Sequence, residues 1–169
     1  MVDIFDNPGI PEDIDIKPNF VRVGDEINLQ NIYPGLKKIT VAAGWDGNNF
    51  GGLELDLDIS LFCLDRKDMT REDGDFIFYN QPQAFDGGIK HHGDSRTGAG
   101  DGDDESISIQ LETIPFDILR IVIFISIYQG YEREQNLGMV RNMYVRLVDS
   151  DRDMEILRFK MDEYLEDSE

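Results

Sequence analysis

The clearest pattern in the chain is an alternation of apolar and polar positions over residues 53–64. Three acids and one serine separate the apolar residues, which are Leu53, Leu55, Leu57, Ile59 and Leu61. Because successive side chains of a strand point to opposite faces of the sheet, this alternation predicts a strand with one buried face.

Similar alternation predicts more strands, separated by turn residues, and no long amphipathic helix. The further strands are expected at residues 21–29, 37–45, 75–80, 106–112, 120–128, 143–148 and 155–160. Short helical turns are expected at 113–119 and 136–142, where the spacing is not that of a strand. Many short strands of this kind predict a mainly β fold, a β-sandwich of two antiparallel sheets with one or two short helical turns.

The length of 169 residues suits one domain with its own core. The net charge of −19 is concentrated in residues 1–15, 93–105 and 161–169, which carry −5, −4 and −5. We therefore expect a poorly ordered acidic lead-in over 1–20, a sandwich domain over 21–160 and an acidic tail over 161–169. Charge of this sign disfavours nucleic acid and anionic membranes, and favours cations or basic partners.

The single cysteine excludes an internal disulfide, and no Cys/His cluster suggests zinc. Cys63 lies in a strand pattern and is expected to be a small core residue. The N-terminus has no secretory pattern, and "ILRIVIFISIY" is too short to span a membrane. These features predict a soluble cytoplasmic protein.

The stretch "HHGDSRTGAGDGDDE", residues 91–105, places five carboxylates in a glycine-rich segment. Calcium suits such a segment because it binds about six to eight oxygens. An EF-hand is excluded because Ser106 stands where its invariant glycine belongs, and a glycine–aspartate β-roll needs neighbouring repeats. Two alternatives remain, a solvated acidic loop or a metal site completed by acids elsewhere. Further oxygen donors for such a site are Asp46, Asp56, Asp58 and Asn80.

The segment "GDSRTGAGDGDDE" resembles the signature of the TerD family of tellurium-resistance and general stress proteins. Further similarities follow in the family's order at residues 36–46, 55–65, 75–81, 105–115 and 131–149, so that the resemblance covers roughly 21–160. It implies a calcium-binding β-sandwich in which two calcium ions sit near one another. The ligands implied by position are Asp56, Asp58, Asn80, Asp94, Thr97, Asp101, Asp103, Asp104 and Glu105.

The chain departs from the family pattern in three places. Ser95 stands where the family commonly has asparagine, and Leu137 replaces a usual phenylalanine. Family domains usually continue into a closing strand, whereas this sequence stops in "MDEYLEDSE". A missing strand would leave a sheet edge open and favour association with another chain.

The first functional hypothesis is a non-enzymatic calcium-binding module of a tellurite or general stress response, which scaffolds a larger assembly. The resemblance implies sibling stress-response proteins as partners, while the acidic charge and the short apolar runs argue against nucleic acid binding and membrane insertion. A second hypothesis is a metal-dependent hydrolase or phosphotransferase, with His91, His92 and Arg96 near the metal. For the histidine pair, however, a solvated surface position is the expectation. A third is a metal-free interaction sandwich, although Trp45 is expected to be partly buried at a strand end.

Overall fold

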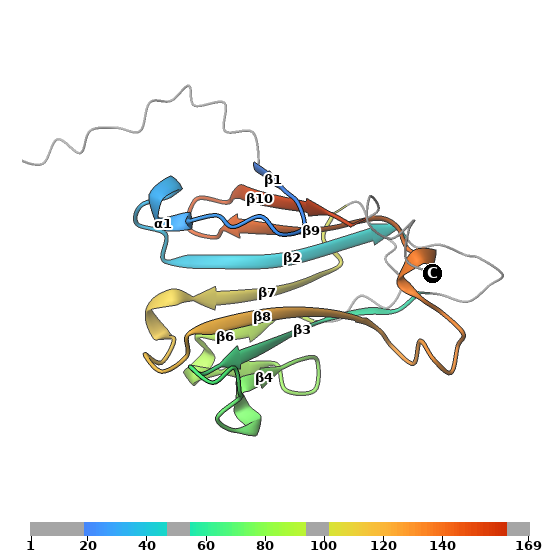
Figure 1. The fold of residues 1–169 in the computed structure, drawn as a ribbon, viewed down its shortest axis with the longest axis horizontal. Coiled ribbons are helices and arrows are strands. Elements are labelled where there is room, and N and C mark those ends of the chain that lie inside the picture. Colours follow the sequence, from blue (N-terminus) through green and yellow to red (C-terminus); the bar gives the residue numbers. More distant parts are fainter. Residues whose placement is uncertain (1–18, 47–54, 94–101, 162–169) are drawn as a thin grey trace, which may run out of the picture.

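The computed structural model describes residues 19–46, 55–93 and 102–161, which form two packed β-sheets (Figure 1). The larger sheet has the order β1-β10-β9-β2-β7-β6-β5. Its strands are β1 (Asn19–Val21), β2 (Lys38–Asp46), β5 (Gln83–Ala84), β6 (Ile89–His91), β7 (Glu105–Gln110), β9 (Arg141–Asp149) and β10 (Met154–Lys160). The smaller sheet has the order β4-β3-β8, formed by β3 (Leu57–Leu64), β4 (Phe76–Ile77) and β8 (Arg120–Ile127). The mainly β sandwich expected from the sequence is confirmed.

Antiparallel pairing dominates both sheets, and β2 lies at the centre of the larger one. Val41 in β2 pairs with Ile107 of β7 on one side and with Leu147 of β9 on the other. The exception is β1, which pairs in parallel with β10 from Asn19 to Val21. The domain therefore begins its first strand two residues before the expected start, while residues 1–18 and 162–169 lie outside the described ranges.

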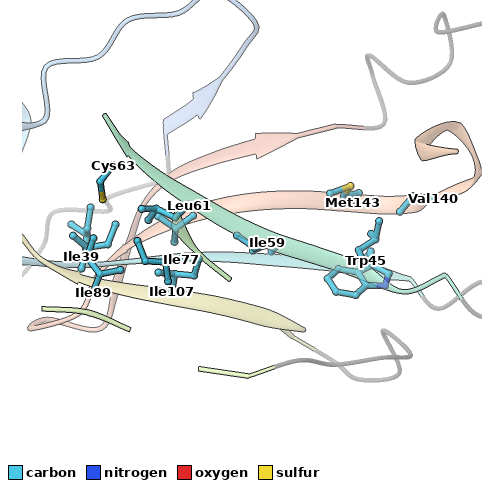
Figure 2. Close-up of a cluster of buried hydrophobic side chains, with 14 of the residues drawn as sticks. Ile39, Trp45, Ile59, Leu61, Cys63, Ile77, Ile89, Ile107, Val140 and Met143 are labelled. Atoms are coloured by element: carbon cyan, nitrogen blue, oxygen red, sulfur yellow. The ribbon is translucent and has the colours of Figure 1, made fainter. Parts of the chain in front are cut away.

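The core lies between the two sheets, and its pattern follows from the alternation in β3. Leu57, Ile59 and Leu61 are at most 1% exposed and pack against residues of β2, β6 and β7. Trp45 groups with Val140 and Met143 at one end of this core, and Cys63 lies at the other end (Figure 2). Cys63 is buried as expected, and Trp45, which was expected to be partly buried, is 4% exposed. Burial raises the pKa of the Cys63 thiol to about 12.

The structure differs from the sequence prediction in the segment before β2. Residues 21–29 were expected to form a strand, but Gly24 adopts a φ of 86° in a turn. The helix α1 (Leu29–Ile32) follows, and the side chain of Asn28 caps it by accepting a hydrogen bond from the Asn31 N–H. The strand prediction is wrong here because a turn and a helix cap interrupt the alternation.

Other differences concern short elements. The strand expected at 75–80 is reduced to the two residues of β4, which follow the 3-10 turn η1 (Asp73–Asp75). The strands β5 and β6 were not expected, nor was the turn η2 (Phe85–Gly87) between them. The turn η4 (Leu137–Met139) falls within the helical segment expected at 136–142, whereas η3 (Leu111–Thr113) reaches the one expected at 113–119 only at its last residue. None of the helices in the described ranges is long and apolar enough to cross a membrane.

The outer face of the larger sheet contains a tight contact at Gly44, which leaves no room for a larger side chain. A Cβ added to Gly44 would lie 2.5 Å from the Cζ of Tyr144 and 2.7 Å from the carbonyl oxygen of Gly102. Gly44→Ala is therefore expected to lower the free energy of unfolding by about 1–3 kcal/mol, because the tyrosine ring and the backbone must move. Urea unfolding followed by circular dichroism measures this loss.

Gly74→Ala is the matched control for Gly44→Ala. A Cβ at Gly74 would meet its nearest neighbour, a side-chain oxygen of Glu72, only at 3.7 Å. This variant is expected to stay within about 0.5 kcal/mol of the wild type. Equal stability of the two variants would contradict the close approach of Tyr144.

Candidate functional site

Three consecutive acids at the start of β7, Asp103 to Glu105, lie at the same end of the sandwich as the end of β2 and the start of β9 (Figure 1). Their side chains contact three different strands. Asp103 contacts β9, where Arg146 donates to it from Nε at 2.8 Å and from Nη2 at 2.7 Å. The Tyr144 hydroxyl adds a third hydrogen bond at 3.0 Å. Asp103 is thus held by a bidentate ion pair on the outer face of the larger sheet.

This ion pair belongs to a closed ring of interactions on that face. Arg146 also donates to Glu155 at 3.0 Å, and Glu155 accepts two bonds of 2.6 Å from Arg158. The Arg158 guanidinium lies 4.1 Å from the centre of the Tyr144 ring, which closes the circuit back to Asp103. Hydrogen bonds from Arg158 lower the pKa of Glu155, while burial, and next Asp103, raise the pKa of Tyr144 to about 12. Both pKa shifts favour the charge states that Glu155 and Tyr144 have at neutral pH, an ionised carboxylate and a neutral phenol.

Asp104 extends the pairing of β7 with β2. Its backbone N–H donates to the Ala43 carbonyl at 2.8 Å, and its carboxylate Oδ2 accepts from the Trp45 N–H at 2.9 Å. A side-chain oxygen thus takes the place of a backbone carbonyl at the end of the ladder. Asp104 therefore fixes the C-terminal end of β2, directly before residues 47–54, which the structure does not describe.

Glu105 connects the two sheets through the core. Its side chain is buried, and its Oε2 accepts a hydrogen bond of 2.6 Å from the N–H of Ile59 in β3. The Nε2 of His91 lies 3.2 Å from the Ile59 carbonyl and 3.8 Å from Glu105 Oε2. The strand β4 pairs with β3 only at Leu61 and Phe62 and does not reach Ile59. The backbone N–H and carbonyl of Ile59 are instead hydrogen-bonded by side chains of the larger sheet, those of Glu105 and His91.

The histidine pair was expected to be a solvated surface pair, and this is wrong for His91. His91 is 4% exposed in β6. His92 is exposed, and its Nε2 lies 2.8 Å from the hydroxyl of Ser108. Burial, followed by the charges of Lys90 and Lys38, lowers the pKa of His92. The alternation of β6 explains the difference, because neighbouring strand residues face opposite sides.

The second group of expected ligands lies around the start of β3. Asp58 is in the strand, 9% exposed and paired with Ser126 of β8. Asp56 directly precedes the strand, and its carbonyl accepts from the Tyr128 N–H at 2.7 Å. Asn80 is exposed in the turn after β4. The other expected ligands fall outside the described residues, namely Asp94, Thr97 and Asp101.

The described donors fit a hard cation in chemistry, since they are carboxylates and an amide. The hydrogen bond from Ile59 to Glu105 brings the start of β7 beside the residue that follows Asp58. Asp103 lies on the other face of the larger sheet, where Arg146 holds both of its oxygens. Within the described ranges, no three His, Cys, Asp or Glu side chains come close enough to hold one metal ion.

Sequence reasoning missed the partners of Asp103. The alternation of residues 143–148 does place Tyr144 and Arg146 on one face of a strand, and this signal was available. Nothing in the sequence, however, shows that this face meets a carboxylate more than 40 positions away in the chain. The pairing of Ile59 with Glu105 was hidden for the same reason.

Comparison with known proteins identifies the family. The family model described as TerD domain matches residues 20–169. The chain belongs to the TerD domain family. This confirms the resemblance drawn from the acidic motif.

Curated relatives of this TerD domain carry resistance and stress names. The tellurium resistance protein TerD of Serratia marcescens is 39% identical over 140 residues, which cover 83% of this chain and 73% of the relative. General stress protein 16U of Bacillus subtilis is 40% identical over 141 residues, with the same coverage of 83% and 73%. Such relatives place this TerD domain among proteins of resistance and stress response.

Solved structures support the fold of this TerD domain. A TerD homologue from Streptomyces coelicolor A3(2) aligns with a TM-score of 0.59 at 23% identity, covering 73% of this chain and 71% of the homologue. A protein of unknown function, SAV2460, aligns with a TM-score of 0.64 at 23% identity, covering 78% of this chain and 75% of its own. At this identity the two structures show the fold alone.

Proposed function

We propose that this TerD domain is a calcium-binding, non-enzymatic module of a tellurite or general stress response that scaffolds a larger assembly. Sibling stress-response proteins of the same family are its proposed partners. Family membership supports the stress-response part. The calcium part rests on the oxygen-rich donor set at one end of the sandwich.

One contact carries the calcium proposal, the hydrogen bond of 2.6 Å between the Ile59 N–H and Glu105. It joins the acidic segment to the strand that contains Asp58, although 46 positions separate the two residues that form it. A site that uses acids from both segments needs this neighbourhood. The proposed ligands are Asp56, Asp58, Asn80, Asp94, Thr97, Asp101, Asp104 and Glu105, with Asp103 available only if Arg146 releases it.

A bound calcium ion would supply positive charge that offsets the repulsion among these carboxylates. Without the ion, the protein's own backbone already holds the part of the site formed by Asp104 and Glu105. Asp104 is fixed to β2 and Glu105 to β3, so both carboxylates are ordered by backbone N–H groups. This preorganisation reduces the conformational entropy lost on binding.

The structure weakens the case for a metal-dependent hydrolase. Such an enzyme needs a base that can reach a substrate, and His91 was one of the two histidines considered for that role. Its ring is buried, with Nε2 directed at the Ile59 carbonyl. We therefore favour the non-enzymatic function.

The proposal predicts that chelator-treated protein binds calcium more tightly than magnesium, because calcium accepts about six to eight protein oxygens whereas magnesium demands a tight octahedron and keeps its waters. Saturation at about a hundredfold excess over Kd adds about 2.7 kcal/mol to the folded state. The melting temperature should therefore rise by about 5–10 °C. Isothermal titration calorimetry and melting curves in chelator and in calcium measure both effects.

The double variant Asp56→Asn/Asp58→Asn should lose most of this binding, because it removes the strand half of the site. Asp73→Asn/Asp151→Asn is the matched control, since it removes the same charge at exposed positions elsewhere. Normal calcium binding by the first variant would confine the site to residues 93–105. Absence of calcium binding by the wild type would refute the proposal.

A further inference from the structure

A pocket lies at the opposite end of the smaller sheet from the acidic segment. The register of β3 with β8 pairs Leu57 with Ile127 at the acidic end and Leu64 with Arg120 at the far end. The pocket opens directly after this far pair and has a volume of about 350 Å³. Its lining residues are Asp65, Arg66, Lys67, Arg71, Phe116, Asp117 and Leu119.

The walls of this pocket are held by their own hydrogen bonds. Asp65 Oδ1 accepts from the N–H of Lys67 at 2.7 Å and from the N–H of Met69 at 3.1 Å. The Leu119 N–H donates to the Leu64 carbonyl at 2.9 Å, which fixes the second wall to the end of β3. The pocket is therefore a formed feature of the fold and not a gap between loose loops.

The acids around this pocket are already committed to partners. Asp117 accepts a bond of 2.7 Å from Arg71, whose guanidinium also binds the buried Asp75. Asp68, beside the pocket, is paired with Arg120 at 2.8 Å. In contrast, neither Arg66 nor Lys67 forms an ion pair with another described residue. Two cations of the lining are thus available to a ligand.

The apolar part of the lining is unusually exposed. Phe116 is 95% exposed and Leu119 is 63% exposed, and both line the pocket together with Arg66 and Lys67. Exposed aromatic and arginine side chains around a concave site are typical of the residues that dominate protein–protein binding energy. The pocket therefore offers a place for a large apolar side chain beside places for carboxylates.

We propose that this pocket binds an acidic segment of a partner protein, with a large apolar side chain seated between carboxylates. Phe116 and Leu119 receive the apolar side chain, and Arg66 and Lys67 receive the carboxylates. The net charge of −19 does not prevent this, because charges more than about 8 Å away are screened at physiological salt. Within the lining, Arg71 is offset by Asp117 and by the buried Asp75, so the charge left for a ligand is that of Arg66 and Lys67 against Asp65.

The test uses a labelled peptide, acetyl-Glu-Asp-Phe-Asp-Leu-Glu-amide, and fluorescence anisotropy with the full chain. We expect saturable binding by the wild type, weakened about tenfold or more in Arg66→Glu/Lys67→Glu, because two contact charges are reversed. Phe116→Ser/Leu119→Ser should weaken binding as well, and both of its positions are exposed enough to leave the fold intact. A peptide with Gln and Asn in place of its acids should bind weakly, and so should one with Ser in place of Phe and Leu.

Arg22→Glu/Lys90→Glu is the matched control, because it reverses the same number of charges at exposed positions outside the pocket. It should bind the acidic peptide as the wild type does. Equal weakening in this control would mean general attraction to the surface and would overturn the proposal. No binding by the wild type at millimolar peptide, or equal binding of the neutral peptide, would also overturn it.

Discussion

Replacing Asp75 with alanine is expected to lower the free energy of unfolding by about 3–5 kcal/mol, the largest loss predicted for this domain. Asp75 is 0% exposed and accepts three hydrogen bonds from Arg71. The backbone N–H, Nε and Nη2 donate at 2.8, 2.9 and 2.7 Å. Removal of the Asp75 carboxylate takes three hydrogen bonds from Arg71, which keeps only Asp117 as a carboxylate partner among the described residues, and leaves a cavity where the buried carboxylate stood. Urea unfolding at pH 7 measures the loss.

Asp73→Ala is the control in the same turn, because Asp73 is exposed, and it should cost no more than about 0.5 kcal/mol. The hydrogen bonds from Arg71 hold the pKa of Asp75 below its usual value of 3.8. A lowered folded pKa adds stability above the unfolded pKa, and this stability is lost as the pH falls through the folded value. The difference between wild type and Asp75→Ala should therefore shrink as the pH drops below about 4. A constant difference across that range would contradict the ion pair.

The second large effect is expected for Glu105→Ala, which should cost about 2–4 kcal/mol even in chelator. The variant removes the acceptor of the Ile59 N–H in the core and leaves a cavity between the sheets. Glu105→Gln keeps an oxygen acceptor of the same shape, so it should retain most of the stability. Urea unfolding of both variants in chelator measures the structural role apart from any metal.

The same two variants separate the structural role of Glu105 from its proposed role as a ligand. In calcium, Glu105→Gln should show a smaller gain in stability than the wild type, because a neutral amide is a weaker calcium ligand. If Glu105→Ala were as stable as wild type in chelator, the connection through Ile59 would be of no energetic importance. A full calcium gain in Glu105→Gln would remove Glu105 from the ligand set.

The parts of the fold that the sequence predicts well are those with long, regular alternation. The apolar row from Leu57 to Leu61 and the pair Ile107 and Ile109 mark strands, and both strands are found; β7 has one buried face as predicted, whereas in β3 the intervening Asp58 and Ser60 are buried as well. The short strands β5 and β6 could not be predicted, because alternation needs more positions to be recognised, and β4 is only part of the strand predicted at 75–80. The error at 21–29 was avoidable, since Gly24 and Asn28 are typical turn and helix-cap residues.

The candidate site was predictable in composition and not in contacts. The run from Asp101 to Glu105 indicates a segment that attracts cations, whatever the fold. The sequence does not indicate that Arg146 binds Asp103, or that the backbone of Ile59 binds Glu105. Those contacts depend on which strands become neighbours across the sheet and across the core. Strand order is a property of the whole chain, and no local pattern contains it.

The central position of β2 in the larger sheet has a consequence for the order of events during synthesis on the ribosome. The strand β2 cannot pair with β7 until Gln110, the partner of Lys38, has been synthesised. It cannot pair with β9 on its other side until Asp149, the partner of Ile39, has been synthesised. The nascent β2 segment, with its run from Ile39 to Trp45, therefore stays unpaired while most of the chain is made. Long-range pairing of this kind slows folding to roughly milliseconds to seconds. An apolar segment that stays unpaired for so long is prone to aggregation, which chaperone binding would prevent.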